Sequence, residues 1–354
     1  MKSIYNYSFN ELVEFLESIG EKKFRATQIF EWLYRFRVSS FEEMTNLSSK
    51  TIDKLKEHLV IDTLEVAEKE VSKDGTTKFL FKLQDERYIE TVLMRHNYGN
   101  SVCVTSQVGC NMGCAFCASG ELGKIRNLTL SEMVLQILMV QKELDKEDAR
   151  VSNIVVMGIG EPFDNYETVL NFLRVVNYPK GLEIGARHIT VSTCGIVPKI
   201  KEFAEFELQI NLAISLHAPN DELRSSLMKI NKRYQLSEVM EALNYYFKKT
   251  NRRVTFEYIL LQGVNDSVAH AKELVRLIKN TDEVGKCCYV NLIPYNEVST
   301  KPFKRTSHEQ AETFFKVLHD NNIQATLRME HGSDISAACG QLRAKKERAK
   351  WVKD

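Results

Sequence analysis

Three cysteines, Cys110, Cys114 and Cys117, form a Cys-x3-Cys-x2-Cys motif directly after an apolar, β-branched run. Thiolate is the usual ligand of iron–sulfur clusters, and three thiolates on one short loop suit three corners of a cubic four-iron cluster. The fourth iron then lacks a protein ligand and is open to a small molecule. A closed zinc site is the alternative, but it needs four nitrogen or sulfur ligands, and no second Cys-x2-Cys or His-x3-His pair lies nearby. The motif therefore favours a cluster with one open iron.

The composition sets the broad class of the protein. With 354 residues and 44% hydrophobic residues, the chain is long enough for about two domains with sizeable cores. Lys and Arg number 48 against 47 Asp and Glu, so a nucleic-acid partner would have to be met by a local basic face. Acidic residues interrupt the first thirty positions, and no apolar run reaches membrane-spanning length. With eight irregularly spaced cysteines, we expect a cytoplasmic protein with no membrane partner.

The periodicity of the chain divides it into four segments. Residues 1–60 carry apolar residues at helical spacing and predict a small helical module, whose basic residues either contact RNA or form an ordinary solvated face. Residues 61–100 alternate as strands do, with a tight turn at Asp74-Gly75, and predict an antiparallel β extension. Residues 101–300 alternate six strand-like runs with helices, and residues 301–354 form a C-terminal segment. The predicted fold is α/β, a partial (β/α)6 barrel with the helical module and the β extension attached.

Polar residues follow the strand-like runs of the predicted barrel. Because ligands bind at the carboxyl ends of parallel strands, residues at these ends are candidates for one site. Each is also typical of a turn or a helix cap, but their recurrence favours a pocket for a polar ligand, in which Glu161 suits an ammonium group. Two other residues have bland interpretations: Glu90 lies within a strand and is expected to face solvent, and Cys339 is expected to be a buried, inert thiol. The strand-end candidates are Gly160, Glu161, Ser192, Ser215, His217 and Asn296.

Taken together, the ordered motifs resemble the RlmN/Cfr family of radical S-adenosylmethionine RNA methyltransferases. The Cys-x3-Cys-x2-Cys spacing alone indicates only the radical S-adenosylmethionine superfamily, and the outlying Cys103 and Cys339 make the resemblance specific. The resemblance covers nearly the whole chain. Besides the cysteine loop, the matching segments are Phe24-Arg25-Ala26-Thr27-Gln28-Ile29, Glu90-Thr91-Val92, Asn127-Leu128-Thr129, Gly160-Glu161-Pro162, Ser215-Leu216-His217-Ala218, Gly263-Val264-Asn265-Asp266, Val290-Asn291-Leu292-Ile293-Pro294-Tyr295-Asn296 and Ala337-Ala338-Cys339-Gly340-Gln341-Leu342.

The resemblance implies a role for each candidate residue. Cys339 would take a methyl group from a first S-adenosylmethionine, and a second S-adenosylmethionine would be cleaved to a radical that activates this methyl for addition to adenine. Cys103 would then release the product by forming a disulfide with Cys339, and Glu90 would accept a proton. Two molecules of S-adenosylmethionine are used per turnover. The cluster ligands would be Cys110, Cys114 and Cys117, and S-adenosylmethionine would be surrounded by Gly160, Glu161, Ser192, Ser215, Leu216, His217 and Asn296.

The resemblance also implies the substrates and partners. The expected product is adenosine methylated at carbon 2, in the peptidyl transferase region of 23S rRNA and 3′ of the anticodon in some tRNAs, because Gly160-Glu161-Pro162 and Asn291-Leu292-Ile293-Pro294 look more like RlmN than Cfr. The expected electron donor is a flavodoxin or ferredoxin, and the expected state is a monomer. A Cfr-like methylation of carbon 8 remains an alternative, as does a non-enzymatic iron–sulfur or zinc protein that binds RNA.

Overall fold

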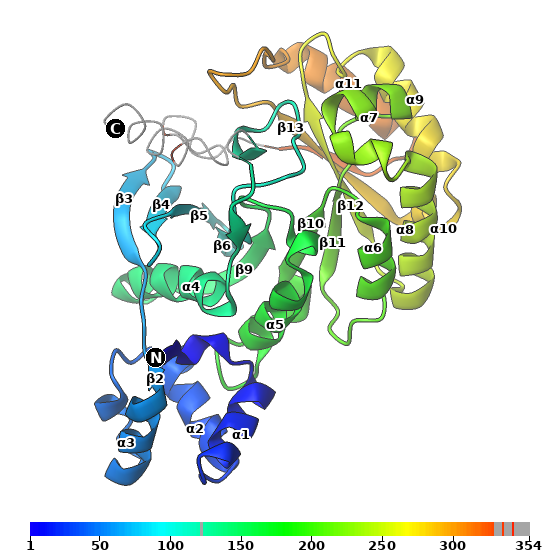
Figure 1. Cartoon of the computed structure of the whole chain (residues 1–354). Helices are drawn as coiled ribbons and strands as arrows, with labels where there is room; N and C mark the ends of the chain where they lie inside the picture. The colour runs from blue at the N-terminus through cyan, green and yellow to red at the C-terminus, as the bar shows by residue number, and fades with distance from the viewer. Residues whose placement is uncertain (121–122, 329–334, 336–341, 343–354) are drawn as a thin grey trace.

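One ten-stranded sheet runs through the computed structural model, which describes residues 1–120, 123–328, 335 and 342 (Figure 1). The strand order is β14-β13-β12-β11-β10-β9-β6-β5-β4-β3. Strands from β6 to β14 run parallel to one another, whereas β3, β4, β5 and β6 pair antiparallel. The strands are β3 Glu65–Val71, β4 Thr77–Lys82, β5 Tyr88–His96, β6 Gly99–Cys103, β9 Val151–Val156, β10 Ile189–Thr193, β11 Asn211–Ser215, β12 Val254–Leu260, β13 Cys288–Pro294 and β14 Ala325–Leu327.

The parallel strands form because short β-branched and apolar runs alternate with amphipathic helices, so each strand is buried between its neighbours and a helix. The six expected barrel strands and the partial-barrel α/β fold are confirmed, and β14 of the C-terminal segment adds a seventh parallel strand to the same sheet. Figure 1 shows the helices that follow these strands lying along the outer side of the curved sheet. They are α4 Leu130–Leu144, α5 Tyr166–Asn177, α6 Val197–Phe203, α7 Asp221–Leu227, α8 Leu236–Thr250, α9 Val268–Lys279, α10 Asp282–Cys287 and α11 His308–Asp320.

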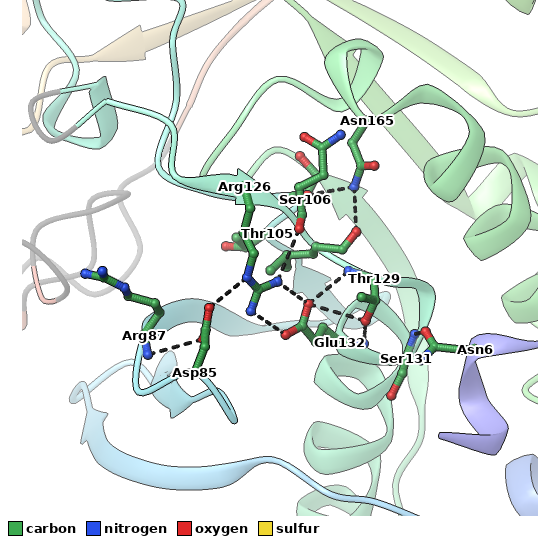
Figure 2. Close-up of polar contacts among 12 residues, drawn as sticks. Asn6, Asp85, Arg87, Thr105, Ser106, Arg126, Thr129, Ser131, Glu132 and Asn165 are labelled. Atoms are coloured by element: carbon green, nitrogen blue, oxygen red, sulfur yellow. Dashed lines mark hydrogen bonds and ion pairs between the residues drawn. The ribbon is translucent and has the colours of Figure 1, made fainter. Parts of the chain in front are cut away.

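The opening segment forms a separate group of helices at one end of the molecule, α1 Phe9–Ser18, α2 Phe24–Glu31 and α3 Ser49–His58 (Figure 1). Their apolar stripes meet in a common core. A short parallel pair, β1 Lys2–Ser3 with β2 Leu59–Val60, brings the two ends of the segment together. The segment also touches the barrel, since the backbone N–H of Ser131 in α4 donates to Asn6 Oδ1 at 2.9 Å (Figure 2).

Figure 2 shows how a charged fork fastens the antiparallel strands to the start of α4. Arg126, in the short strand β8 Arg126–Asn127 that pairs with β7 Gln107–Val108, donates to both carboxylate oxygens of Glu132 at 2.8 Å. Its Nε donates to Asp85, in the turn between β4 and β5, also at 2.8 Å. Glu132 also forms a capping box with Thr129 at the first turn of α4. Arg126 thus holds the β4–β5 turn and the first turn of α4 in a fixed position relative to β8.

Gln136 in α4 supports the point where the chain leaves β6 for the cysteine loop. The side chain is fully buried, and its Oε1 accepts the Thr105 N–H at 2.8 Å and the Thr91 hydroxyl at 2.9 Å. Its Nε2 donates to the Thr105 carbonyl at 3.0 Å. One amide therefore satisfies both backbone groups of a residue that lies beyond the sheet ladder, where no strand partner would otherwise meet them.

We expect Gln136→Leu to lower the free energy of unfolding by about 3 kcal/mol, because a buried N–H and a buried carbonyl lose their partners. Urea denaturation followed by circular dichroism measures the change. The matched control is Gln84→Leu, which makes the same substitution at an exposed position and should change stability by less than about 0.5 kcal/mol. Equal stability of the two variants would contradict the role given to Gln136.

None of the helices in the described ranges is long and apolar enough to cross a membrane.

Candidate active site

A cavity of about 390 Å³ opens at the carboxyl ends of the parallel strands. Residues from strands β6, β9, β10, β11, β12 and β13, or from the loops that follow them, contribute to its wall. The cavity brings together candidates that are up to 193 positions apart in the chain, from Cys103 to Asn296. Of the residues predicted from the sequence, those that line it are Cys103, Cys110, Cys114, Cys117, Gly160, Glu161, Ser192, Ser215, His217 and Asn296.

The cysteine loop is fixed to the rest of the barrel by backbone hydrogen bonds. The Ala115 N–H donates to the carbonyl of Leu227, the last residue of α7, at 2.8 Å, and Tyr295 Oη donates to the Phe116 carbonyl at 3.0 Å. Gly109 makes the entry to the loop possible, because it has φ +82° and a Cβ there would lie 1.8 Å from the Gly123 carbonyl oxygen. All three thiols consequently face one cavity.

Burial controls the charge of these thiols. Burial raises the pKa of Cys110 to about 12 and raises the pKa of Cys114 still further, so both are protonated at neutral pH unless a cation binds them. A metal centre deprotonates the thiols that coordinate it. Within the described residues, no three His, Cys, Asp or Glu side chains converge on a single metal ion. The three thiols instead surround a shared space, which fits a cluster in which each thiolate binds a different iron.

Glu161 provides a carboxylate inside the cavity, as expected from its position after β9. It is 4% exposed, and its oxygens accept the Phe163 N–H at 3.0 Å and the Cys194 N–H at 2.8 Å. Burial raises the pKa of Glu161, while these hydrogen bonds act in the opposite direction. The preceding Gly160 has φ +108°, and a Cβ there would lie 2.6 Å from Gln107 Cβ. A cationic ligand group beside Glu161 would keep the carboxylate ionised.

His217 lies beyond β11 and is a neutral hydrogen-bond donor in this site. Burial, aided by the charge of Arg224, lowers the pKa of His217 to about 3. Its Nδ1 accepts the Ile259 N–H at 3.1 Å, so the proton of the neutral ring is on Nε2. The ring packs edge-on against Phe116 with centroids 5.0 Å apart, which joins the cysteine loop to the strand end.

Leu216, the residue before His217, differs from the other strand-end candidates. Its side chain is fully buried in the barrel core and does not line the cavity. Its backbone is also engaged, since its N–H donates to the Glu257 carbonyl at 3.0 Å and its carbonyl accepts Arg224 Nε at 3.2 Å. The resemblance therefore places Leu216 among the residues around S-adenosylmethionine, whereas in the structure its side chain points into the core.

The antiparallel strands contribute a second group of residues next to the same cavity. Cys103, at the end of β6, pairs with Val92 in β5 and with Val155 in β9. Its side chain is 9% exposed and packs with Val92 and Met94, which also line the cavity. Cys103 therefore lies at the junction of the antiparallel and parallel parts of the sheet and lines the same cavity as the cysteine loop.

The expectation that Glu90 faces solvent is wrong. Glu90 is 4% exposed, and its Oε2 lies 2.8 Å from Nζ of Lys78, whose side chain is fully buried. The reason is that both faces of these strands are covered. Helix α4 packs on one face, where Thr91 bonds Gln136, and on the other face the described residue Leu342 packs against Leu80 and Tyr88. Glu90 does not itself line the cavity, but it lies on the same face as Val92, which does.

Cys339, the expected methyl carrier, lies outside the described residues, so its placement is not tested. The structure also brings in residues that the sequence did not single out. Glu257, within β12, lines the cavity and accepts a hydrogen bond from Asn291 Nδ2 at 2.8 Å. Burial raises the pKa of Glu257. The sequence could have indicated Glu257, because it is a charged residue within an otherwise apolar strand. Nothing comparable in the sequence indicated Arg224 of α7.

We expect Cys114→Ala to reduce bound iron from about four atoms per chain to nearly none after anaerobic reconstitution, because one corner of the cluster loses its ligand. Iron and sulfide analysis measures the change. Cys287→Ala is the matched control, since Cys287 is an exposed cysteine at the end of α10, and it should retain full iron. A Cys114→Ala variant with wild-type iron content would exclude Cys114 as a ligand, and zinc in place of iron would favour the closed zinc site.

Comparison with known proteins agrees with this site. Residues 104–278 match the model of the Radical SAM superfamily, which implies a four-iron cluster and S-adenosylmethionine, and residues 2–61 match the ribosomal RNA large subunit methyltransferase N-terminal domain. The chain is 60% identical over 343 residues to the "Probable dual-specificity RNA methyltransferase RlmN" of Bacillus licheniformis, covering 97% of this chain and 94% of that protein. The protein of the same name in Bacillus subtilis is 57% identical, with 97% and 93% covered.

Among solved structures, a radical SAM methyltransferase from Sphaerobacter thermophilus superposes with a TM-score of 0.91 at 44% identity, covering 97% of this chain and all of that one. Identity at this level, over nearly the full length of both chains, extends from the helical module through the cavity to the last strand. The chain therefore belongs to the RlmN family of radical S-adenosylmethionine methyltransferases.

Proposed function

We propose that this protein methylates carbon 2 of adenosine in 23S rRNA and in tRNA, by way of a methyl group carried on Cys339. The observation that carries the proposal is the cavity itself, which the three cysteines of the loop share with Cys103. Family membership supports the RNA substrates, because the relatives are named as dual-specificity RNA methyltransferases and the N-terminal model is that of a ribosomal RNA methyltransferase.

The chemistry of adenine explains why such a site is needed. Carbon 2 lies between two ring nitrogens, is electron-poor and does not attack a sulfonium methyl group, so an ordinary methyl transfer has no nucleophile. A carbon radical adds where a nucleophile cannot. The cluster and S-adenosylmethionine supply this radical chemistry when they are bound, and the protein supplies position, thiols and proton transfer. The roles left for the chain are therefore those of methyl carrier, proton acceptor and product-releasing thiol.

Chain geometry supports the assignment of Cys339 as carrier and Cys103 as the releasing thiol. Leu342, three residues after Cys339 in the sequence, is buried against Leu80 and Tyr88 on the sheet face that also carries Cys103. Attack of the Cys103 thiolate on the Cys339 sulfur forms the disulfide and breaks the carbon–sulfur bond to RNA. The electron pair of that bond leaves with the base, and a proton completes its methyl group.

Glu90 is the proposed proton acceptor for the hydrogen on carbon 2. Its carboxylate lies on the face that ends at Cys103, since Val92, the next residue of β5 on that face, pairs with Cys103. The ion pair with Lys78 at 2.8 Å provides a buried cation beside this carboxylate.

The helical module offers a surface suited to RNA. Phe24 is 51% exposed with the Arg25 guanidinium 4.9 Å from its ring, and Phe36 is 53% exposed with that of Arg35 at 5.8 Å. Exposed aromatic rings and arginines are the groups on which unstacked bases are held. Arg35 also forms an ion pair with Glu31 at 3.0 Å, and the neighbouring Arg37 forms one with Asp145 at 2.7 Å.

These assignments give each of the four segments of the chain a proposed role. Residues 1–60 bind RNA, residues 61–100 provide Lys78 and Glu90, residues 101–300 hold the cofactors, and residues 301–354 carry Cys339. The boundary at residue 100 divides the chain by proposed function only. The sheet is continuous across it, since β5 pairs with β6. One-electron reduction of the cluster requires a donor, for which a flavodoxin or ferredoxin is suited. We propose that the enzyme is a monomer and that it acts on its RNA substrates in the cytoplasm.

The proposal predicts 2-methyladenosine as the product. Anaerobically reconstituted protein is incubated with S-adenosylmethionine, a reductant, protein-free 23S rRNA and unmodified tRNA, and nucleosides are identified by mass spectrometry. We expect 2-methyladenosine in both RNAs. 8-Methyladenosine would instead indicate Cfr-like chemistry, product in rRNA alone would remove the tRNA activity, and no methylated adenosine despite an intact cluster would contradict the proposal.

We expect Cys103→Ala to stop after less than one turnover, with protein covalently attached to RNA, because no thiol then attacks the Cys339 sulfur. Denaturing gel electrophoresis with labelled RNA detects the adduct. Cys287→Ala, at an exposed site, should turn over normally without an adduct, and Cys103→Ala/Cys339→Ala should form none while retaining iron. Normal turnover of Cys103→Ala would show that Cys103 is not the releasing thiol.

A further inference from the structure

Arg224 is fully buried and has the largest such side chain among the described residues. It lies in α7, directly behind the strand ends that form the cavity. Its guanidinium donates to the carbonyls of Cys194 at 2.7 Å, Ser215 at 3.2 Å and Leu216 at 3.2 Å, and to Asn231 Oδ1 at 2.9 Å. All four acceptors are neutral oxygens, so these contacts hold the guanidinium in place without neutralising it.

No carboxylate forms an ion pair with Arg224 within the part of the chain that the structure describes. Asp221, one turn earlier in α7, accepts hydrogen bonds from Asn231 and from the Leu236 N–H at 2.9 and 2.8 Å. A guanidinium stays protonated even where burial lowers its pKa, as burial does for Arg224. Among the described residues, the Arg224 charge therefore lies in the interior without an ion-pair partner, although the Asp221 carboxylate acts on it through space. A buried charge is costly unless an anion lies near it.

The hydrogen bonds of Arg224 and of α7 connect this charge to the cavity and to the cysteine loop. The peptide groups flanking Cys194 join two buried charges, because the Cys194 N–H donates to Glu161 and the Cys194 carbonyl accepts from Arg224. The last residue of α7, Leu227, accepts the Ala115 N–H of the cysteine loop, so α7 holds the loop and the guanidinium together. Cys194 and Ser215, whose carbonyls accept hydrogen bonds from Arg224, line the same cavity as the three thiols of the loop.

We propose that Arg224 is a positioning residue whose fixed charge compensates the anionic cluster held by Cys110, Cys114 and Cys117 and thereby raises its reduction potential. Three thiolates give the oxidised cluster a net negative charge, and one-electron reduction adds another. A buried cation stabilises the reduced state more than the oxidised state, because the added electron interacts with it in a poorly screened interior. Arg224 thus acts on the reduction potential of the cluster through its charge, while its hydrogen bonds hold the strand ends in place. The inference rests on the proposed cluster ligands and not on the site of methylation.

The test is a redox titration of the cluster, followed by electron paramagnetic resonance, in the anaerobically reconstituted full-length protein. We expect Arg224→Gln to shift the midpoint potential to lower values and Arg224→Lys to leave it near that of the wild type. Arg174→Gln is the control, because Arg174 is an exposed arginine paired with Glu207, and it should not shift the potential. Iron content and a thermal melt are recorded for each variant, so that loss of the fold is recognised.

An unchanged potential in an Arg224→Gln variant with full iron would overturn the inference and leave Arg224 as a structural clamp. If Arg224→Gln folds without binding iron, the lysine variant decides. Full iron in Arg224→Lys would show that the charge is needed for the cluster to bind, whereas loss of iron in both variants would overturn the charge role. Failure of Cys114→Ala to lose iron would remove the premise separately, and failure to methylate RNA would leave the measured potential valid.

Discussion

The proposed cluster requires three partly buried thiols to become three anions in one small cavity, and the charges around the cavity bear on that requirement. Burial keeps Cys110 and Cys114 protonated, so the loop holds a charged cluster only if irons displace the thiol protons and the surroundings accept the resulting negative charge. One backbone contact of the loop, from the Ala115 N–H to the Leu227 carbonyl, runs to α7, which also carries Arg224, an arginine buried behind the strand ends. Structural support for the loop and electrostatic support for its ligand thus come from the same helix.

The sheet also brings the proposed cofactor-binding residues and the proposed proton acceptor and releasing thiol to the same region. Its parallel part presents Glu161, Ser192, Ser215 and His217 at successive strand ends, as a partial barrel does. Its antiparallel part presents Glu90 and Cys103 on one face. Strand β6 belongs to both parts, because it pairs antiparallel with β5 and parallel with β9, and Cys103 is its last residue. A single strand therefore places a thiol where the cofactor side and the substrate side of the proposed reaction meet.

Much of this arrangement could be predicted from the sequence because it depends on local patterns. Alternating strand and helix periodicity located the six barrel strands and α4, and the glycine and hydroxyl residues at the strand ends indicated the cavity. These signals work because parallel strands place their carboxyl ends at one edge whatever the details of packing. Strand ends do not decide which side chains reach the cavity, since Leu216 is buried in the core and the next residue, His217, lines the cavity.

The remaining features could not be predicted because they depend on what covers a surface. Glu90 looked like a solvent-facing strand carboxylate, and only a residue more than two hundred positions away, Leu342, shows that its face is covered. Arg224 stands in the run Asp221-Glu222-Leu223-Arg224, which has the charges of an exposed helical turn. Its burial follows from α7 lying across the ends of β10 and β11, where three strand-end carbonyls need donors and one guanidinium can reach them all. A charge buried in this way is invisible to periodicity, yet it is the feature that sets the electrostatic potential in which the cluster has to work.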